Sequence, residues 1–311
     1  MNKKKVLVAG ATGYLGNKIA FELLKLGAEV TAMVRASSDR SKLLEMGVKN
    51  FVVGDMMDAT SLSEALSPAY GFDAIVASAA GYTKRTKGDS PVTDTIGYQN
   101  LVDATKAAGI PRFILISILE SDKAKSVPHF YNKYLIEKYL KEKKQPFIAL
   151  RPGAFLDQTP DYIIKKITKG ILPTFLTGTY GIIYTAQLAK YAAMAAVVLA
   201  DSELNTSVDI GWDKPVNDKT LAAAFASVLK KPIEVKPVIP PFALKYILPV
   251  IAKFNDGIDD MYQMIKWIDT GVYISKNPQL QKELFKELPT VEESVRQYCL
   301  DRGLIQENIF S

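Results

Sequence analysis

The sequence predicts an α/β protein with a doubly wound parallel sheet and a smaller mixed α/β cap domain toward the C-terminus. Short apolar runs alternate with helix-length segments through the first 150 residues, and this alternation fades after Gly153. The chain has 311 residues, which exceeds the size at which a single core stops growing. We therefore expect two domains, residues 1–154 and residues 155–311, the second interleaved with the sheet.

Six apolar runs of strand length are expected to form the sheet: Val6–Ala9, Val30–Val34, Phe51–Val53, Ala74–Ala77, Phe113–Ile116 and Phe147–Leu150. Helix signals separate them. Gly27 ends the first helix, Ser61 with Glu64 is interpreted as a capping box, and Gly109 ends the helix before the fifth strand. The cap is expected to contain the helices Asp161–Lys169, Ala186–Ala200 and Lys219–Leu229 and the strands Val208–Gly211 and Ile233–Val238.

A glycine-rich segment follows the first strand directly and opens a helix. Its first glycine permits a tight turn, the second lets backbone amides approach a pyrophosphate, and the third allows the helix to pack closely on the strand. The positive end of the helix then faces the phosphates. This strand–turn–helix context predicts a Rossmann domain that binds NAD(P) through Gly10, Thr12, Gly13, Tyr14, Leu15 and Gly16.

The end of the second strand indicates which dinucleotide is bound. About twenty residues beyond the glycine loop, such folds place a carboxylate for a ribose 2′-hydroxyl or an arginine for a 2′-phosphate. This chain has Arg35 there, followed by Ser37, and no acidic residue. Because a guanidinium forks onto phosphate oxygens and a hydroxyl adds a donor, we expect NADP(H) in preference to NAD(H).

Two further strand ends are candidate cofactor contacts. Asp55 and Met56 follow the third strand at the carboxyl edge of the sheet, where the Asp55 carboxylate could accept from the adenine amino group. An alternative interpretation of Asp55 is a turn or helix-capping residue. Ala79 follows the fourth strand in a segment small enough for a cofactor to pass close by.

The composition excludes several classes of partner and site. The net charge of +6 is spread along the chain, which gives no support to nucleic-acid binding. Cys299 is the only cysteine and His129 the only histidine, so we expect no disulfide framework and no metal site. No apolar segment approaches the roughly 20 residues that span a bilayer. We expect a cytoplasmic protein without a membrane partner, as a monomer or homodimer.

The glycine loop, Arg35, Gly54-Asp55, the Ser117 strand end, Lys133 and Arg151-Pro152-Gly153 together resemble the atypical short-chain dehydrogenase/reductases of the NmrA-like group. That group includes isoflavone-type and divinyl-type reductases, quinone- and dye-reducing relatives, and redox-sensing regulators that bind NADP. The resemblance is good over residues 1 to 155 and holds only in outline beyond them. It implies a tyrosine and a lysine one helical turn apart, with the lysine on the cofactor ribose and the tyrosine as proton donor.

Two registers compete for this pair. Tyr134 and Lys138 have the literal spacing, whereas Lys133 has His129 in the place of the tyrosine. Lys133 fits the group better, because its distance from Arg151-Pro152 and its position ahead of Glu137 resemble the group's pattern. Lys133 is therefore the expected ribose-binding lysine.

The choice of Lys133 leaves the proton donor open. His129 is one candidate, because an imidazole titrates near neutral pH; Tyr131, Tyr82 and water are the others. The resemblance further implies that Ser117, at the end of the fifth strand, polarises a substrate carbonyl, and that Gly153 lies against the nicotinamide. Alternatively, Ser117 is a helix cap or a strand-end hydroxyl.

The leading hypothesis is an NADPH-dependent oxidoreductase that reduces a carbonyl, quinone or activated double bond of an apolar small molecule. A stretch rich in aromatic residues between Pro237 and Trp267 could line a pocket for an apolar or aromatic substrate, or could form ordinary helix core. The alternative is a non-catalytic NADP(H)-binding redox sensor. A sugar-nucleotide epimerase or dehydratase ranks last, because the standard tyrosine base is missing.

Overall fold

The computed structural model describes residues 3–80, 92–157, 160–174, 176 and 178–306. The chain divides into two compact units. The first comprises residues 1–151 and 185–208, and the second comprises residues 152–184 and 209–311. The sequence places the boundary at residue 154 and expects interleaving; in the structure one segment of the second half, residues 185–208, belongs to the first unit.

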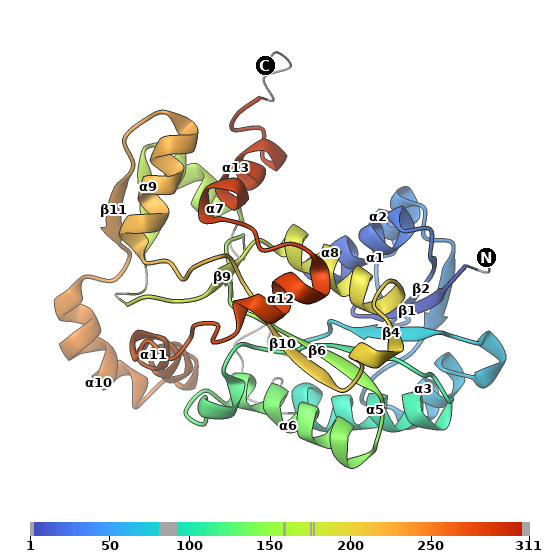
Figure 1. The fold of residues 1–311 in the computed structure, drawn as a ribbon. Helices are drawn as coiled ribbons and strands as arrows, with labels where there is room; N and C mark the ends of the chain where they lie inside the picture. The colour runs from blue at the N-terminus through green and yellow to red at the C-terminus, as the bar shows by residue number, and fades with distance from the viewer. Residues whose placement is uncertain (1–2, 81–91, 158–159, 175, 177, 307–311) are drawn as a thin grey trace. The chain divides into compact units, whose positions relative to one another are not determined.

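A seven-stranded sheet dominates the fold, in the order β10-β6-β5-β4-β1-β2-β3 (Figure 1). The pairings from β6 through to β3 are all parallel. The strand order reverses between β1 and β4, so the loops after these two strands run in opposite directions. Folds of this kind bind ligands at such a switch point. The strands are β1 Lys5–Ala9, β2 Glu29–Val34, β3 Asn50–Val53, β4 Ala74–Ala77, β5 Phe113–Ile116, β6 Phe147–Pro152 and β10 Thr206–Ile210.

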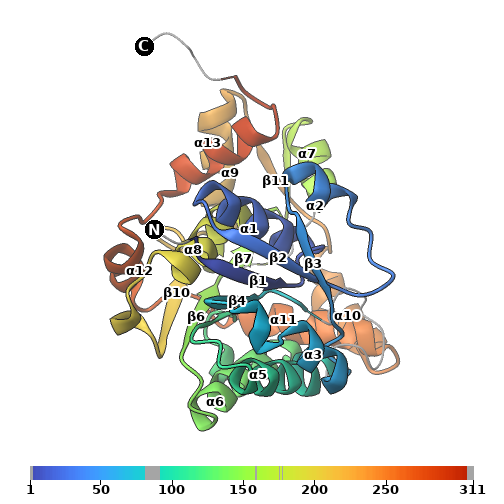
Figure 2. The same cartoon turned by 90° about the vertical axis from the view of Figure 1, so that its right-hand side faces the viewer.

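Helices cover both faces of the sheet. In Figures 1 and 2, α1 and α8 lie on one face, and α3, α5 and α6 lie on the other. The helices and turns of this unit are α1 Tyr14–Lys25, α2 Ser41–Met46, α3 Ala59–Ala65, η1 Pro68–Tyr70, η2 Thr93–Gly97, α5 Tyr98–Ala107, η3 Ser121–Lys123, α6 Pro128–Glu142, α8 Thr185–Val197 and η4 Asp201–Glu203.

The predicted fold class is confirmed, and all six predicted strands are present with ends shifted by two residues at most. The side chains of β1, β4 and β5 are buried on both faces, as continuous apolar runs require in a parallel sheet covered by helices, whereas the edge strand β3 is partly exposed. The capping box expected at Ser61 is wrong. Helix α3 begins two residues earlier, and Asp58 caps it by accepting from the Thr60 and Ser61 amides.

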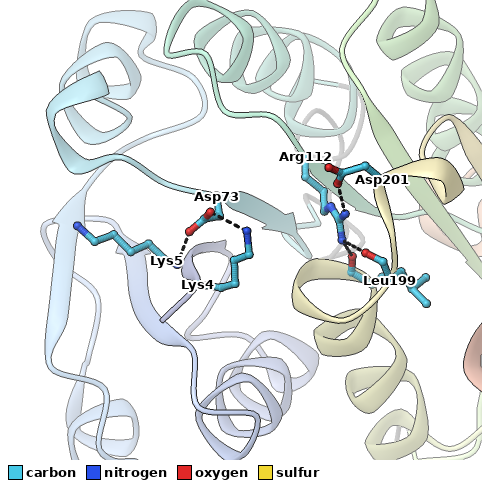
Figure 3. Close-up of polar contacts among 7 residues, drawn as sticks. Lys4, Lys5, Asp73, Arg112, Leu199 and Asp201 are labelled. Atoms are coloured by element: carbon cyan, nitrogen blue, oxygen red, sulfur yellow. Dashed lines mark hydrogen bonds and ion pairs between the residues drawn. The ribbon is translucent and has the colours of Figure 1, made fainter. Parts of the chain in front are cut away.

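Buried Arg112 ties residues 185–208 to the sheet (Figure 3). From the start of β5, its guanidinium donates to the carbonyls of Ala195 and Leu199 at the end of α8, at 2.9 and 2.8 Å, and pairs with Asp201 at 2.5 Å. A cation at a helix C-terminus satisfies carbonyls that have no partner within the helix. To the left of Arg112 in Figure 3, Asp73 accepts from the Lys5 amide at 2.8 Å and from Lys4 Nζ at 3.0 Å.

The second unit is built from short strands and several helices. Two small parallel sheets pair β7 with β9 and β8 with β11. None of the helices described in the structure is long and apolar enough to cross a bilayer. The elements are β7 Ala154–Phe155, α7 Pro160–Ile167, β8 Ile171–Thr174, β9 Ile182–Ile183, α9 Asp218–Leu229, β11 Glu234–Pro237, η5 Ala243–Ile247, α10 Leu248–Ala252, α11 Asp256–Asp269, α12 Pro278–Phe285 and α13 Val291–Asp301.

Candidate dinucleotide site

The glycine loop after β1 has no room for side chains. Gly10 has a φ of +85°, and a Cβ on it would lie 2.7 Å from the Ala79 amide nitrogen. A Cβ on Gly16 would lie 2.0 Å from the Gly10 carbonyl oxygen and 2.9 Å from Ser78 Oγ. The first and third glycines are therefore required by close packing of β1, β4 and α1, in agreement with the roles expected for them.

The N-terminus of α1 opens beside this turn. Gly13 is the N-cap residue, and no side chain caps the helix. Thr12, Gly13 and Tyr14 are exposed, whereas Leu15 and Gly16 are buried. The first helical amides thus face the exposed end of the loop, and no acidic residue stands in the first turn. This is the arrangement that binds a phosphate.

Arg35 follows β2 and is exposed. A tight turn fixes its backbone: the Arg35 amide donates to Ser38 Oγ at 3.2 Å, and the Ser38 amide donates to the Arg35 carbonyl at 3.0 Å. Among the described residues, no carboxylate lies within ion-pair distance of its guanidinium. Ser37 is exposed in the same turn. Both side chains remain available to an anionic ligand.

A second arginine of this region has no assigned role in the site. Arg40 precedes α2, and its guanidinium lies 5.4 Å from the centre of the Phe51 ring. A cation–π contact of this kind holds the group against an apolar surface. Because Arg40 lies beyond the serine turn, the sequence assigns it no role at the end of β2.

Asp55 lies in a local turn. Its Oδ1 accepts from the Met57 amide at 2.9 Å, and its own amide donates to Ser61 Oγ at 2.9 Å. Asp55 is thus the turn residue that the sequence allowed as an alternative. The turn holds its exposed carboxylate at the end of β3. Met56 is buried, and its carbonyl accepts from Asn100 at 3.0 Å. Adenine contacts of Asp55 and Met56 stay predictions.

Lys133 lies at the centre of a buried group, here called the Lys133 cluster: Lys133, Asp94, Tyr98 and the Ala79 carbonyl. Lys133 is 6% exposed. Its Nζ lies 3.1 Å from Asp94 Oδ1, 3.4 Å from the Ala79 carbonyl oxygen and 4.0 Å from the centre of the Tyr98 ring. The Tyr98 hydroxyl donates to the same carbonyl at 2.5 Å. Glycine loop, β4 and Lys133 therefore converge on Ala79.

The Lys133 ammonium is held in its charged form. Burial by itself would lower the pKa of Lys133, but the facing Tyr98 phenol and Asp94 carboxylate outweigh burial, so that its pKa is raised above the usual 10.5. Burial raises the pKa of the Tyr98 phenol, a shift that Lys133 opposes. The Lys133 ammonium thus packs against the Tyr98 ring, 4.0 Å from its centre. Lys138, the lysine of the competing register, is exposed.

The candidate proton donors lie in different environments. Helix α6 begins at Pro128, so His129 stands four residues before Lys133 within the helix. His129 is buried, with its ring edge-on to Phe130 at 4.6 Å. Tyr131 packs near Tyr134, with 5.7 Å between the ring centres. Tyr82 lies outside the described residues.

Ser117 belongs to a second buried group on α6, the Glu137 cluster: Glu137, Ser117, Arg151 and Ser207. Glu137 accepts from Ser117 Oγ at 2.5 Å and from Ser207 Oγ at 2.8 Å. Arg151 donates to both carboxylate oxygens, with Nε–Oε1 at 2.9 Å and NH2–Oε2 at 2.5 Å. Since a hydroxyl has one proton to donate, Ser117 gives it here to Glu137 and not toward a substrate.

Gly153 lies in the second unit and is buried. A Cβ on it would lie 2.4 Å from the Gly181 carbonyl carbon, and its amide donates to the Ile210 carbonyl at 3.0 Å. Close packing of β7 against β9 therefore explains why residue 153 is a glycine. Its contact with a nicotinamide stays a prediction.

Asp94 and Tyr98 were missed by sequence reasoning. They are four residues apart and straddle the junction of η2, a π-helical turn, and α5. The segment before them has no apolar strand pattern, so nothing in the sequence pairs it with α6. A short π-helical turn in an otherwise α-helical segment is often found at functional sites.

Comparison with known proteins gives a family and a common fold. Residues 2–295 match the NmrA-like family. The photosystem II assembly factor Ycf39 of Cyanophora paradoxa is 36% identical over 137 residues, 44% of this chain and 41% of that protein. The chain thus spans about two fifths of the length of this relative.

Two solved structures share the fold. Triphenylmethane reductase of Citrobacter sp. with NADP(H) has a TM-score of 0.74 and 20% identity, covering 94% of this chain and 99% of that one. The NADPH-dependent quinone oxidoreductase QOR2 of Escherichia coli with NADPH has a TM-score of 0.73 and 18% identity, with the same coverage.

Proposed function

Because the chain belongs to the NmrA-like family, we propose that it binds NADP(H) and reduces a carbonyl, quinone or activated double bond of an apolar small molecule. The observation that carries the proposal is the convergence on Ala79, where a side-chain-free glycine turn, a helix N-terminus and a buried, charged Lys133 meet. The two solved structures, which hold NADPH or NADP(H) in the same fold, support the choice of cofactor.

Each part of the dinucleotide has residues that fit it. The amides at the start of α1 and the bare backbone of Gly10 and Gly13 would hold the pyrophosphate. Arg35 and Ser37 would hold the 2′-phosphate. Lys133 would donate to the nicotinamide ribose hydroxyls. The residues present thus fit the phosphorylated dinucleotide.

The cofactor, when bound, supplies the hydride. The protein residues have three other tasks. Lys133 fixes the ribose and brings a positive charge to the reacting end of the cofactor. The buried Asp94 and Tyr98 position that ammonium. The proton that balances hydride transfer to a carbonyl comes from His129, Tyr131, Tyr82 or water, since Ser117 directs its proton to Glu137.

The choice of cofactor is tested by titrating NADPH and NADH into Arg35→Ala and, as a matched control, Arg40→Ala. Loss of a guanidinium–phosphate contact should weaken NADPH binding by a factor of ten or more and change NADH binding by less than about twofold. Arg40→Ala should leave the ratio of the two affinities nearly unchanged. Equal losses of NADPH and NADH binding in Arg35→Ala would refute the assignment.

Turnover is tested separately. The wild-type chain should oxidise NADPH in the presence of at least one member of a panel of quinones, enones and cationic dyes. NADPH binding without turnover on the whole panel would favour the second candidate, a regulator that binds NADP(H) without reducing a substrate. Two observations support that candidate: the engaged Ser117 hydroxyl, and the similarity to a photosystem II assembly factor.

A further inference from the structure

A pocket of about 330 Å³ lies within the second unit. The ends of β8 and β11 form one side of it, and η5 and α11 form the other. The sequence expects an apolar pocket in this region. Of the aromatic residues expected to line it, Tyr262 does so, whereas Trp267 is buried and Phe242, Tyr246 and Phe254 are exposed.

The wall of the pocket is mainly aliphatic. Six apolar side chains and the ring of Tyr262 contribute to it, and its volume is near the lower end of the range of about 300–1,000 Å³ for small-molecule sites. The aliphatic residues are Leu176, Pro237, Ile239, Pro241, Leu244 and Ile265. Such a wall favours a small ligand with an apolar body.

Two lysines from different elements also line the pocket, Lys245 on η5 and Lys266 on α11. In the part of the chain that the structure describes, neither has a carboxylate within ion-pair distance. Each lies near an aromatic ring: Lys245 Nζ is 5.1 Å from the centre of Tyr246, and Lys266 Nζ is 5.4 Å from the centre of Tyr262. Two cations thus share one small apolar pocket.

Asp269 is the acidic residue of the pocket wall. Its Oδ1 accepts from the Gly178 amide at 3.1 Å, which gives this carboxylate a role in the backbone of the unit. A second carboxylate, Asp218, hydrogen-bonds to Thr174 of the pocket wall and accepts from the Tyr180 hydroxyl at 3.1 Å. Both carboxylates are thus held by donors of the unit, whereas the two lysines have no carboxylate partner among the described residues. An anionic ligand could pair with these ammonium groups, and a neutral one would gain nothing from them.

We propose that this pocket binds an amphipathic anion, a small apolar molecule with one carboxylate, with its apolar body against Leu244 and Ile265 and its charge between Lys245 and Lys266. The proposal goes beyond the proposed function, because it concerns binding within the second unit and requires neither NADP(H) nor turnover. Its failure would leave the Arg35 test untouched.

The test uses three probes of one chain length: octanoate, octanol and octylammonium, titrated into the full chain by calorimetry without cofactor. Octanoate should bind about tenfold more tightly than octanol, and octylammonium should bind more weakly than either. Added salt should narrow the difference between octanoate and octanol, because it screens exposed charges. Equal affinity for octanoate and octanol would overturn the proposal.

Variants then locate the site. Lys245→Met and Lys266→Met keep the apolar stems and should each weaken octanoate binding about threefold while leaving octanol binding unchanged. Lys253→Met, an exposed lysine that follows α10 and does not line the pocket, is the matched control. Leu244→Trp fills the pocket and should weaken octanoate and octanol binding together. Octanoate affinity unchanged in both Lys245→Met and Leu244→Trp would overturn the proposal.

Discussion

Helix α6 carries two buried polar clusters one turn apart, and they differ in how completely they are satisfied. In the Glu137 cluster, both carboxylate oxygens accept from at least two donors, supplied by Ser117, Arg151 and Ser207. In the Lys133 cluster, the ammonium contacts one carboxylate oxygen at 3.1 Å, one carbonyl oxygen at 3.4 Å and the Tyr98 phenol. Glu137 is saturated by the protein through bonds mostly of 2.9 Å or less, whereas the Asp94 and Ala79 oxygens lie farther from Lys133 Nζ.

The difference separates a structural polar cluster from a binding one. A buried carboxylate with every acceptor position filled fixes β5, β6 and β10 against α6, and a ligand would have to displace one of those bonds. A buried ammonium beside the glycine turn whose contacts are longer can exchange one of them for a bond to a ligand at smaller cost. The geometry thus agrees with a ribose-binding role for Lys133. It agrees less well with a role for Ser117 in polarising a substrate carbonyl.

The largest expected effect is on stability, at Glu137. Glu137→Ala leaves the Arg151 guanidinium without its carboxylate and should lower the free energy of unfolding by about 3 kcal/mol. Glu142→Ala, at an exposed position of the same helix, is the control and should change it by less than about 0.5 kcal/mol. Urea denaturation measures both. Similar values for the two variants would remove the contrast between the clusters.

The next effect is on binding, at Lys133. Replacing both charges in Lys133→Met/Asp94→Leu should leave the free energy of unfolding within about 1 kcal/mol of the wild type, because apolar residues of similar size often replace a buried ion pair without loss. NADPH binding should weaken at least tenfold, about 1.4 kcal/mol. Lys138→Met is the exposed control. A double variant that binds NADPH normally would assign the Lys133 cluster to structure.

A smaller effect on stability is expected at Ser207. Ser207→Ala removes one of several donors to Glu137 and should lower the free energy of unfolding by about 1 kcal/mol. NADPH affinity should be unchanged. Ser202→Ala, exposed on η4, provides the baseline. Thermal and urea unfolding measure the change. A loss of stability as large as that of Glu137→Ala would mean that the Ser207 hydroxyl alone accounts for the stabilising effect of Glu137.

The smallest effect is the pH dependence of binding. The pKa of Lys133 in the folded protein is raised above its usual 10.5. Below pH 10.5 the positive charge of Lys133 therefore contributes fully to NADPH binding. This contribution is lost only as the pH rises through the higher folded-state pKa. The dissociation constant of NADPH should therefore stay nearly constant between about pH 7 and 10. Asp94→Asn removes one group that raises this pKa, and should bring the loss of affinity to a lower pH. A steep loss in the wild type below pH 10 would contradict the charged-lysine interpretation.

The C-terminal part of the chain was harder to predict than the sheet. Runs such as Val6–Ala9 and Phe113–Ile116 are buried on both faces, so hydrophobic pattern and strand length agree. The strands β7 and β9 have two residues each and leave no such pattern. In α10, Leu248 and Ala252 are buried, whereas Phe254, just beyond the helix end, is 86% exposed, although all three are apolar.

The sequence by itself determined the glycine turn, the parallel sheet and the position of Arg35, because backbone sterics and short-range periodicity act between residues close in the chain. Only the tertiary structure decided that Asp94 and Tyr98 would enclose Lys133, that Glu137 would take the Ser117 proton, and that Lys245 and Lys266 would share a pocket. Those contacts join residues 20 or more positions apart. Their chemistry depends on burial and distance, which composition and spacing along the chain do not encode.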